Sequence, residues 1–299
     1  MLKRVFIFFA VSLLVSITIS TLMSVLGIGH YITAGGLQYG SLMAFCLMWG
    51  IGGSFITLLI SKPLAKWTMG VEIISGTNQY PELVSKVHRL ATRAGLGTMP
   101  EVGIYKSDDI NAFATGATKN NSLVAVSTGL INRMNDEAIE GVLAHEVAHI
   151  ANGDMVTMTL VQGVINAFVM FFSRVAAYAI SQAMRSDDDD APASPFMNMM
   201  IVFVLDIVFG LLAMPIVAWF SRYREYRADS GGASLAGREK MISALQALQR
   251  AYPQLAEARE EVNPNFRSMQ ISSKESMMKL FSTHPPLAER IERLKQQPI

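Results

Sequence analysis

Residues 144–160 read Ala-His-Glu-Val-Ala-His-Ile-Ala-Asn-Gly-Asp-Met-Val-Thr-Met-Thr-Leu, and they join a helical pattern with two histidines to a long apolar run. His145 and His149 are four residues apart, so on a helix they share one face. Two imidazoles at that spacing bind one Zn²⁺, and the carboxylate of Glu146 reaches a water molecule beside it. The stretch therefore predicts a metal site on a helix.

A metal site that keeps one position open for water needs a third protein ligand. The best candidate lies in Ser-Arg-Tyr-Arg-Glu-Tyr-Arg-Ala-Asp, residues 221–229, where Glu225 and Asp229 are again one helical turn apart. Glu225 is predicted to bind the metal, and Asp229 to accept the outer N–H of a ligating histidine and so fix its tautomer. The same residues also fit a charged helix start with Arg–Glu pairs, but the two-histidine motif that lacks a third ligand favours the metal interpretation.

The 299-residue chain is poor in charge, with 16% Asp, Glu, Lys and Arg against 51% hydrophobic residues. Soluble domains average about 25% charged residues. The deficit excludes a disordered chain and an ordinary soluble globule, and a formal net charge of +1 implies no nucleic-acid partner. Cys46 is the single cysteine, so no internal disulfide forms. Much of the chain is expected to lie outside water.

The first apolar stretch covers residues 5–61, which contain no Asp, Glu, Lys or Arg. A spanning helix needs about 20 apolar residues. The stretch therefore predicts two helices, near 5–26 and 37–60, with a glycine-rich turn at 27–36. It is too long for a cleaved signal peptide and has no cleavage site after it.

Two further apolar runs, at 155–173 and 197–220, predict a helical hairpin through or into the membrane. A loop rich in aspartate and proline, residues 185–195, separates them. Arg174 and Asp206 are costly among hydrocarbon unless they are buried or paired. We expect a simple ion pair rather than a proton relay.

Lys and Arg residues flank the apolar runs on one side only, which sets their orientation. They precede the first run and follow the second and fourth: Lys3, Arg4, Lys62, Lys66, Arg222, Arg224 and Arg227. The N-terminus and the polar remainder are therefore expected on the cytoplasmic side. The predicted segments are two transmembrane helices in 1–61, a first polar part in 62–154, the hairpin in 155–221 and a second polar part in 222–299.

The two polar parts predict one mixed domain. Helices are expected over 81–94, from Asn135, over 237–252 and over 285–296. Short strands are expected over 101–105, 110–115 and 122–127, whereas 262–273 fits no element. The predicted fold class is α+β, mostly helical with a small β-sheet, combined with four apolar helices.

The sequence resembles the HtpX-type membrane zinc metallopeptidases, which are kin to the CAAX prenyl endopeptidases. The resemblance rests on residues 109–116 (DINAFATG), 123–130 (LVAVSTGL), 144–160, 219–225 (WFSRYRE) and 283–287 (THPPL). Together with the four apolar runs these stretches cover nearly the whole chain. Residues 185–197 and 250–275 match least.

The resemblance implies a gluzincin-like fold in which the two polar parts form a zinc peptidase domain. It implies one zinc ion per chain held by His145, His149 and Glu225, with Glu146 as general base and later proton donor. It also implies proteolysis of membrane proteins on the cytoplasmic side of the inner (plasma) membrane. The expected roles are protein quality control and the envelope stress response.

Two further groups of site residues come from the resemblance. Asn111, Ala112 and Phe113 look like the edge strand against which an extended substrate pairs. His284 and Arg290 are similar to groups that steady the oxyanion. The implied partners are polypeptide substrates and the lipid bilayer, without nucleic acid.

Three alternatives stay open. A non-catalytic membrane scaffold would need a fourth protein ligand to close the zinc site, and the sequence offers no strong candidate. Prenyl-peptide processing is another substrate choice, although four helices give no obvious large prenyl chamber. The histidines allow zinc without excluding other divalent metals.

Because both segments that carry the predicted ligands adjoin the hairpin, we expect the hairpin to position the site for substrates that emerge from the membrane.

Overall fold

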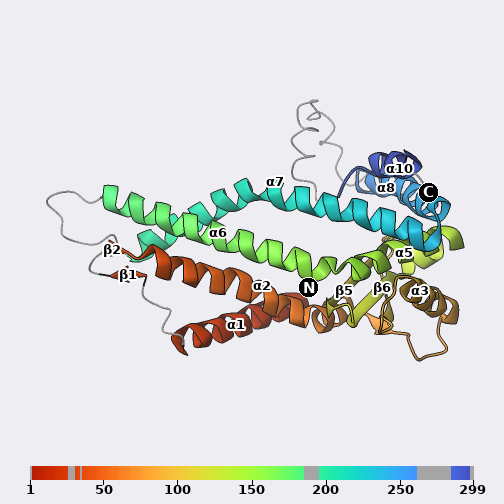
Figure 1. Ribbon diagram of the computed structural model, residues 1–299, viewed down its shortest axis with the longest axis horizontal. Coiled ribbons are helices and arrows are strands. Elements are labelled where there is room, and N and C mark those ends of the chain that lie inside the picture. Colours follow the sequence, from red (N-terminus) through yellow and green to blue (C-terminus); the bar gives the residue numbers. More distant parts are fainter. Residues whose placement is uncertain (1, 26–30, 34–35, 185–194, 261–283, 297–299) are drawn as a thin grey trace. The chain divides into compact units, whose positions relative to one another are not determined.

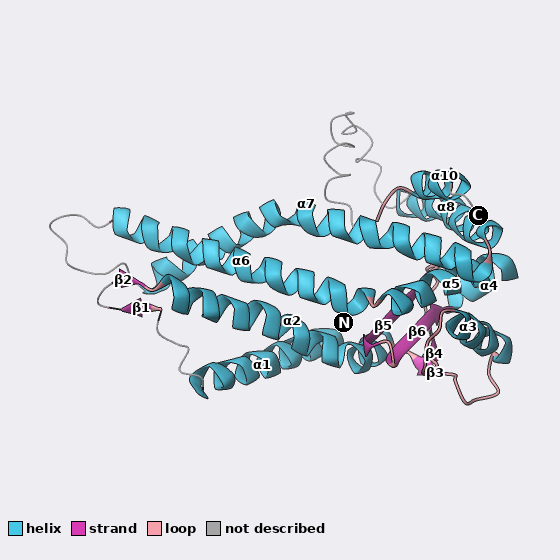
Figure 2. Cartoon of the chain, viewed as in Figure 1, coloured by secondary structure: helices cyan, strands magenta, loops and turns pink. Residues whose placement is uncertain are grey.

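The computed structural model describes residues 2–25, 31–33, 36–184, 195–260 and 284–296 (Figure 1). The chain folds as two compact units, and each unit uses two separate stretches of sequence. The first contains Met1–Leu58 and Met158–Val217, and the second contains Leu59–Thr157 and Ala218–Ile299. Helices dominate both units, and the strands of the larger sheet all belong to the second (Figure 2).

The first unit follows the apolar runs of the sequence. It contains α1 (Leu2–Val25), most of α2 (Tyr39–Met69) and α6 (Asp154–Ala183), the first part of α7 (Pro195–Ala236), and a short antiparallel pair, β1 (Ile32–Thr33) and β2 (Gly36–Leu37). Within the described ranges, α2, α6 and α7 are long and apolar enough to cross a membrane, and α1 contributes a shorter apolar stretch, Leu13–Val25. Only 17%, 11% and 0% of the residues in their most apolar windows are buried, so these helices present apolar side chains outward.

Small residues let α2 and α6 pack closely. A Cβ added at Gly50 would lie 2.5 Å from the carbonyl oxygen of Gly163 and 2.8 Å from Cβ of Ala167. Leu42, Cys46 and Ala167 are fully buried and form a small core in the same unit. This is the close backbone approach that glycine and alanine permit between apolar helices.

The two charges within the apolar helices lie near each other. Nη1 of Arg174 on α6 is 3.9 Å from Oδ1 of Asp206 on α7, and it donates a hydrogen bond to the carbonyl of Met170. The guanidinium also lies 5.6 Å from the centroid of the Phe45 ring. This geometry fits the predicted ion pair. The loop predicted at 185–195 lies outside the described residues except for its last position.

The second unit contains a four-stranded sheet with the order β3-β4-β6-β5. β4 (Glu101–Tyr105) pairs parallel with β6 (Asn121–Ser127), whereas β3 (Glu72–Ile73) and β5 (Ala112–Thr118) pair antiparallel at the two edges. The strand predicted at 110–115 therefore begins two residues later and runs on to Thr118. Gly116 permits the close approach of β5 to β6, because its φ is +144° and an added Cβ would collide with the carbonyl of Asn121.

Among the described residues, the second unit contains the helices α3 (Pro81–Arg93), α4 (Thr128–Arg133), α5 (Asp136–Asn152), α8 (Arg238–Glu260) and α10 (Leu287–Gln296), together with the last parts of α2 and α7 and the first residues of α6. Most of α5 is buried, and its side chains Leu143, Val147 and Ile150 are fully covered in the largest core cluster. Asn135 caps α5 by accepting a hydrogen bond from the N–H of Ala138, and Gly153 ends it in the left-handed region at φ 70°. The predicted helix at 237–252 extends to Glu260, and residues 262–273 lie outside the described ranges.

Candidate metal centre

Helices α5 and α7 bring three potential metal ligands together. His145 and His149 lie one turn apart on α5, and Glu225 on α7 faces both. The Nε2 atoms of the two histidines are 3.1 Å apart. Oε2 of Glu225 is 3.5 Å from Nε2 of His145, and Oε1 is 3.4 Å from Nε2 of His149. The ligand atoms of all three residues lie within 4.8 Å of one another.

These separations fit a zinc ion. Bonds from zinc to nitrogen or oxygen are about 2.0–2.1 Å, so two ligand atoms at a tetrahedral angle lie about 3.3–3.4 Å apart. The observed separations of 3.1, 3.4 and 3.5 Å are close to this value. Two nitrogens and one carboxylate oxygen are also the donor types of catalytic zinc sites, which keep a fourth position open.

Each histidine is oriented by a second carboxylate at its outer nitrogen. Oδ1 of Asp229 lies 3.1 Å from Nδ1 of His145, and Oδ2 of Asp154 lies 2.7 Å from Nδ1 of His149. Both aspartates are almost fully buried. A carboxylate that accepts the Nδ1–H leaves the Nε2 lone pair for a metal. Sequence reasoning singled out Asp229 but missed Asp154.

Arg290 on α10 binds the carboxylate of Asp229 and lies close to that of Glu225. Its Nε and Nη2 donate to the two oxygens of Asp229 at 2.8 and 2.6 Å, and its Nη1 lies 3.5 Å from Oε2 of Glu225. Burial disfavours the guanidinium charge, but these carboxylates outweigh the burial and raise the pKa of Arg290. The hydrogen-bonding groups of Arg290 are therefore largely occupied within the protein, and its predicted contact with a substrate oxyanion stays a prediction.

The imidazole of His149 has a raised pKa. Burial disfavours its charged form, but hydrogen bonds to Asp154 and Glu225 outweigh the burial and raise the pKa to about 9. A metal binds only the neutral imidazole, so protons compete with a metal for this ligand.

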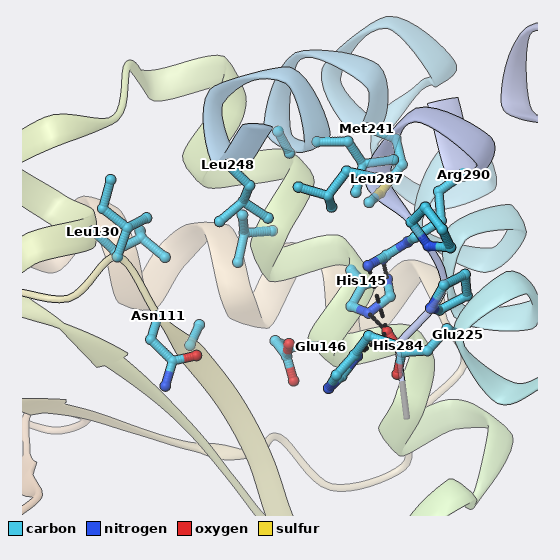
Figure 3. A pocket seen from close by; sticks show the side chains of 17 residues that line it. Asn111, Leu130, His145, Glu146, Glu225, Met241, Leu248, His284, Leu287 and Arg290 are labelled. Atoms are coloured by element: carbon cyan, nitrogen blue, oxygen red, sulfur yellow. Dashed lines mark hydrogen bonds and ion pairs between the residues drawn. The ribbon is translucent and has the colours of Figure 1, made fainter. Parts of the chain in front are cut away.

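Glu146 and His284 are the more accessible polar groups of the site. Nδ1 of His284 is 3.1 Å from Oε2 of Glu225, and 68% of its side chain is exposed. Glu146 is partly exposed and lines the same pocket as His145 and Glu225. Figure 3 shows Glu146 between Asn111 and His284, without a drawn interaction to its carboxylate. Glu146 is therefore placed where it can meet a water molecule or a substrate.

The predicted substrate strand reaches the site in part. Asn111 and Ala112, at the start of β5, line the pocket. The Phe113 ring instead packs on Tyr105, with ring centroids 5.6 Å apart, in a separate core cluster. Asn111 and Ala112 thus line the pocket whereas Phe113 does not, and substrate contact by these three residues stays a prediction.

The fold and the donor set together define a class, the membrane metallopeptidases. Residues 77–297 match the description "Peptidase family M48", which is most of the chain, so the chain belongs to that family.

Relatives extend this match to nearly the whole length. The chain is 49% identical over 297 residues to a protease HtpX homolog of Paracidovorax citrulli, 48% over 297 residues to the protease HtpX of Shewanella pealeana, and 46% over 305 residues to a protease HtpX homolog of Bacillus subtilis. These alignments cover at least 98% of this chain and 99% of each relative. The resemblance drawn from the motifs is confirmed, and the chain is a metalloendopeptidase.

A solved structure supports the fold class. The crystal structure of S. mikatae Ste24p matches with a TM-score of 0.62 at 21% identity, covering 98% of this chain and 66% of that chain. At this identity the likeness shows the fold alone. It confirms the predicted class, a mostly helical domain with a small sheet combined with apolar helices.

Proposed function

We propose that this membrane metalloendopeptidase uses zinc to hydrolyse peptide bonds of misfolded or damaged membrane proteins on the cytoplasmic side of the inner membrane. The observation that carries the proposal is the donor set of His145, His149 and Glu225, with ligand atoms within 4.8 Å, beside a pocket that Glu146 lines. In this proposal residues 62–154 and 222–299 form the peptidase domain, and 1–61 and 155–221 form the membrane part.

The catalytic roles follow from the chemistry of each side chain. His145, His149 and Glu225 would hold the ion, which when bound supplies a Lewis acid that polarises the scissile carbonyl and lowers the pKa of water. Glu146 takes the proton of the attacking water and passes it to the leaving amine. Asp229 accepts the N–H of His145 and keeps its other nitrogen directed toward the metal position.

The free edge of β5 suits an extended substrate. The carbonyl of Asn111 accepts a hydrogen bond from the N–H of Ser127 on β6. Neighbouring pairs of an antiparallel ladder alternate in type, so the next pair, Ala112 with Val126, exchanges no backbone hydrogen bonds. The N–H and C=O of Ala112 therefore point toward the free edge, where a substrate strand would pair with them.

Two cationic or polar groups would favour the developing oxyanion. His284 lies beside Glu225, with its Nδ1 3.1 Å from Oε2 of Glu225 and 68% of its side chain exposed, so a substrate carbonyl at the metal position can approach its imidazole. Arg290 stays bonded to Asp229, and its positive charge favours the oxyanion through space. We therefore assign the direct contact to His284.

Features outside the site support the substrate class and the location. The helices α2, α6 and α7 are apolar enough to cross a membrane, and Lys and Arg flank the apolar runs on one side. The resemblance to HtpX-type proteases supports a role in protein quality control and the envelope stress response.

A comparison of the wild type with Glu146→Gln tests the proposal. Both proteins are purified in detergent, metal content is measured by elemental analysis, and cleavage of an unfolded protein and a membrane protein is followed. We expect one zinc per chain in both and a loss of about 10²–10⁴-fold in cleavage for Glu146→Gln. Glu137→Gln, an exposed carboxylate on the same helix, is the matched control and should cleave like the wild type. Zinc in the wild type without any cleavage would overturn the proposal and favour a structural zinc site.

A further inference from the structure

A mainly apolar pocket of about 410 Å³ opens beside the metal ligands in the second unit (Figure 3). Glu146 lies between its two ends: His145, Glu225 and His284 are on one side, and Leu130 and Leu248 are on the other. The apolar wall comes from helices α5, α8 and α10 and from the chain that leads into β5, through Ile110, Val142, Ala244, Leu245, Leu248 and Leu287. The pocket therefore joins the place of chemistry to a surface of aliphatic side chains.

The charged groups of the pocket gather at its metal end. The guanidinium of Arg290 is bound to Asp229 at 2.6 and 2.8 Å, so it is not free to pair with a substrate carboxylate. A charged side chain, acidic or basic, would exchange its water for the aliphatic walls at the other end. An uncharged apolar side chain avoids this cost and gains from leaving water.

We infer that this pocket receives the side chain of the substrate residue next to the cleaved bond, and that it selects a large uncharged apolar side chain such as leucine, methionine or phenylalanine. The inference rests on the proposed function, because Glu146 must lie within hydrogen-bond reach of the reacting groups. A residue that adjoins the cleaved bond then has the apolar end of the same cavity within reach of its side chain. The volume lies in the lower part of the range for ligand pockets, about 300–1,000 Å³, which suits one large side chain and its backbone.

Leu248 is the position that sets the size of the pocket. Leu245 and Met241 on the same helix are 0% and 2% exposed and belong to the core, so replacing them would disturb the fold. Leu248 is only partly buried and lies in the pocket wall. The neighbouring Gln249 is exposed and does not line the pocket, so it offers a matched control.

The test compares cleavage sites in the full chain, purified in detergent with zinc. The wild type, Leu248→Trp, Leu248→Ala and Gln249→Trp are each given an unfolded protein, and the cleaved bonds are identified by mass spectrometry. Peptides that differ only in leucine or alanine beside the scissile bond then give the leucine-to-alanine ratio of kcat/KM. We expect leucine, methionine and phenylalanine to be enriched at one flanking position in the wild type. The ratio should fall by about 10-fold or more in Leu248→Trp and stay unchanged in Gln249→Trp.

Leu248→Ala is the second variant, for the case in which Leu248→Trp does not fold. Its smaller side chain enlarges the pocket, so it should also cleave substrates that carry tryptophan beside the scissile bond. A wild type that cleaves without preference at either flanking position would overturn the pocket assignment and leave the proposed function standing. An unchanged ratio in a folded Leu248→Trp, or no gain for tryptophan in Leu248→Ala, would overturn it equally. A wild type that binds zinc and cleaves nothing would instead overturn the proposed function, and the pocket assignment with it.

Discussion

Asp154 is expected to orient the imidazole of His149, and a substitution can test this role. Its Oδ2 lies 2.7 Å from Nδ1 of His149, and its backbone carbonyl accepts a hydrogen bond from Nη1 of Arg224 at 3.2 Å. Removing such a carboxylate frees the imidazole to turn and lowers its basicity. We therefore expect Asp154→Ala to lower zinc affinity by about 10–100-fold, measured by competition with a chelator. Asp154→Asn, which keeps an acceptor oxygen, should lose less, and equal zinc affinity in all three proteins would contradict the assignment.

At the scale of single residues, the sequence predicted the pairs of site residues that helical spacing places on one face of a helix. His145 and His149, and likewise Glu225 and Asp229, are four residues apart on continuous helices, so each pair shares a face. Asp154 follows His149 by five residues, which helical spacing places on different faces. It reaches the histidine because Gly153 turns the chain at φ 70°. A turn of this kind leaves no periodic signal, which is why Asp154 was missed.

At the scale of elements, one buried carboxylate joins three helices. Glu140 on α5 is 7% exposed and accepts hydrogen bonds from Arg89 on α3 and from Lys240 on α8, each at 2.8 Å. Burial raises the pKa of Glu140, but the hydrogen bonds and charges of Lys240 and Arg89 outweigh it, so the pKa lies below its ordinary value of 4.5. A lowered pKa in the folded state means that the ion pairs add stability above about pH 4.5, and that this stability is lost as the pH falls through the lowered pKa.

We therefore expect Glu140→Gln to be less stable than the wild type at pH 7, by about 1 kcal/mol because both cations are partly exposed to solvent. Thermal unfolding in detergent between pH 7 and pH 3.5 measures the difference, which should shrink below pH 4.5. Glu137→Gln, on the exposed face of α5, controls for the general effect of acid. A difference between Glu140→Gln and the wild type that stays constant over this range would contradict the prediction.

The contact between α2 and α6 depends on glycine at position 50, which has no side chain to separate the two helices. A Cβ at Gly50 would lie 2.5 Å from the carbonyl oxygen of Gly163, whereas one at Gly52 would meet nothing within 4 Å. Gly50→Val should therefore destabilise the first unit by about 1–3 kcal/mol, the usual cost of overpacking. Gly52→Val changes the same helix without the collision and should unfold near the wild-type temperature in detergent. Equal loss in both variants would mean that helix propensity rather than packing decides.

Elements whose own residues carry a local pattern were predicted well, whereas pairing between strands was not predicted. The strand at Glu101–Tyr105 was predicted with its observed bounds, and the amphipathic helix over 81–94 differs from α3 by one residue. β3 has only two residues and exists through its ladder with β4, so no local pattern marks it. The parallel pairing of β4 with β6 likewise depends on the fold rather than on either strand alone.

At the scale of the whole molecule, the two units share helices. Helix α7 contains an apolar stretch, none of whose most apolar window is buried, and also Glu225, the proposed metal ligand. Helix α6 begins at Asp154. We expect that replacing residues 155–220 with a soluble linker abolishes cleavage of membrane proteins while zinc still binds, because His145, His149 and Glu225 all remain. The physical reason is that the hairpin is proposed to present the site to substrates that emerge from the bilayer.

This prediction needs both readouts on the same preparations. Elemental analysis reports the metal, and cleavage of a membrane protein reports the presentation of substrate. A chain in which only residues 186–194 become a glycine-serine linker of equal length keeps both apolar runs and should stay active. Full cleavage of membrane proteins by the chain without its hairpin would show that the peptidase domain finds these substrates unaided. Loss of zinc from that chain would show that the hairpin is needed for the ligands themselves, because α7 supplies Glu225 and Asp229 from the same helix that carries the apolar run.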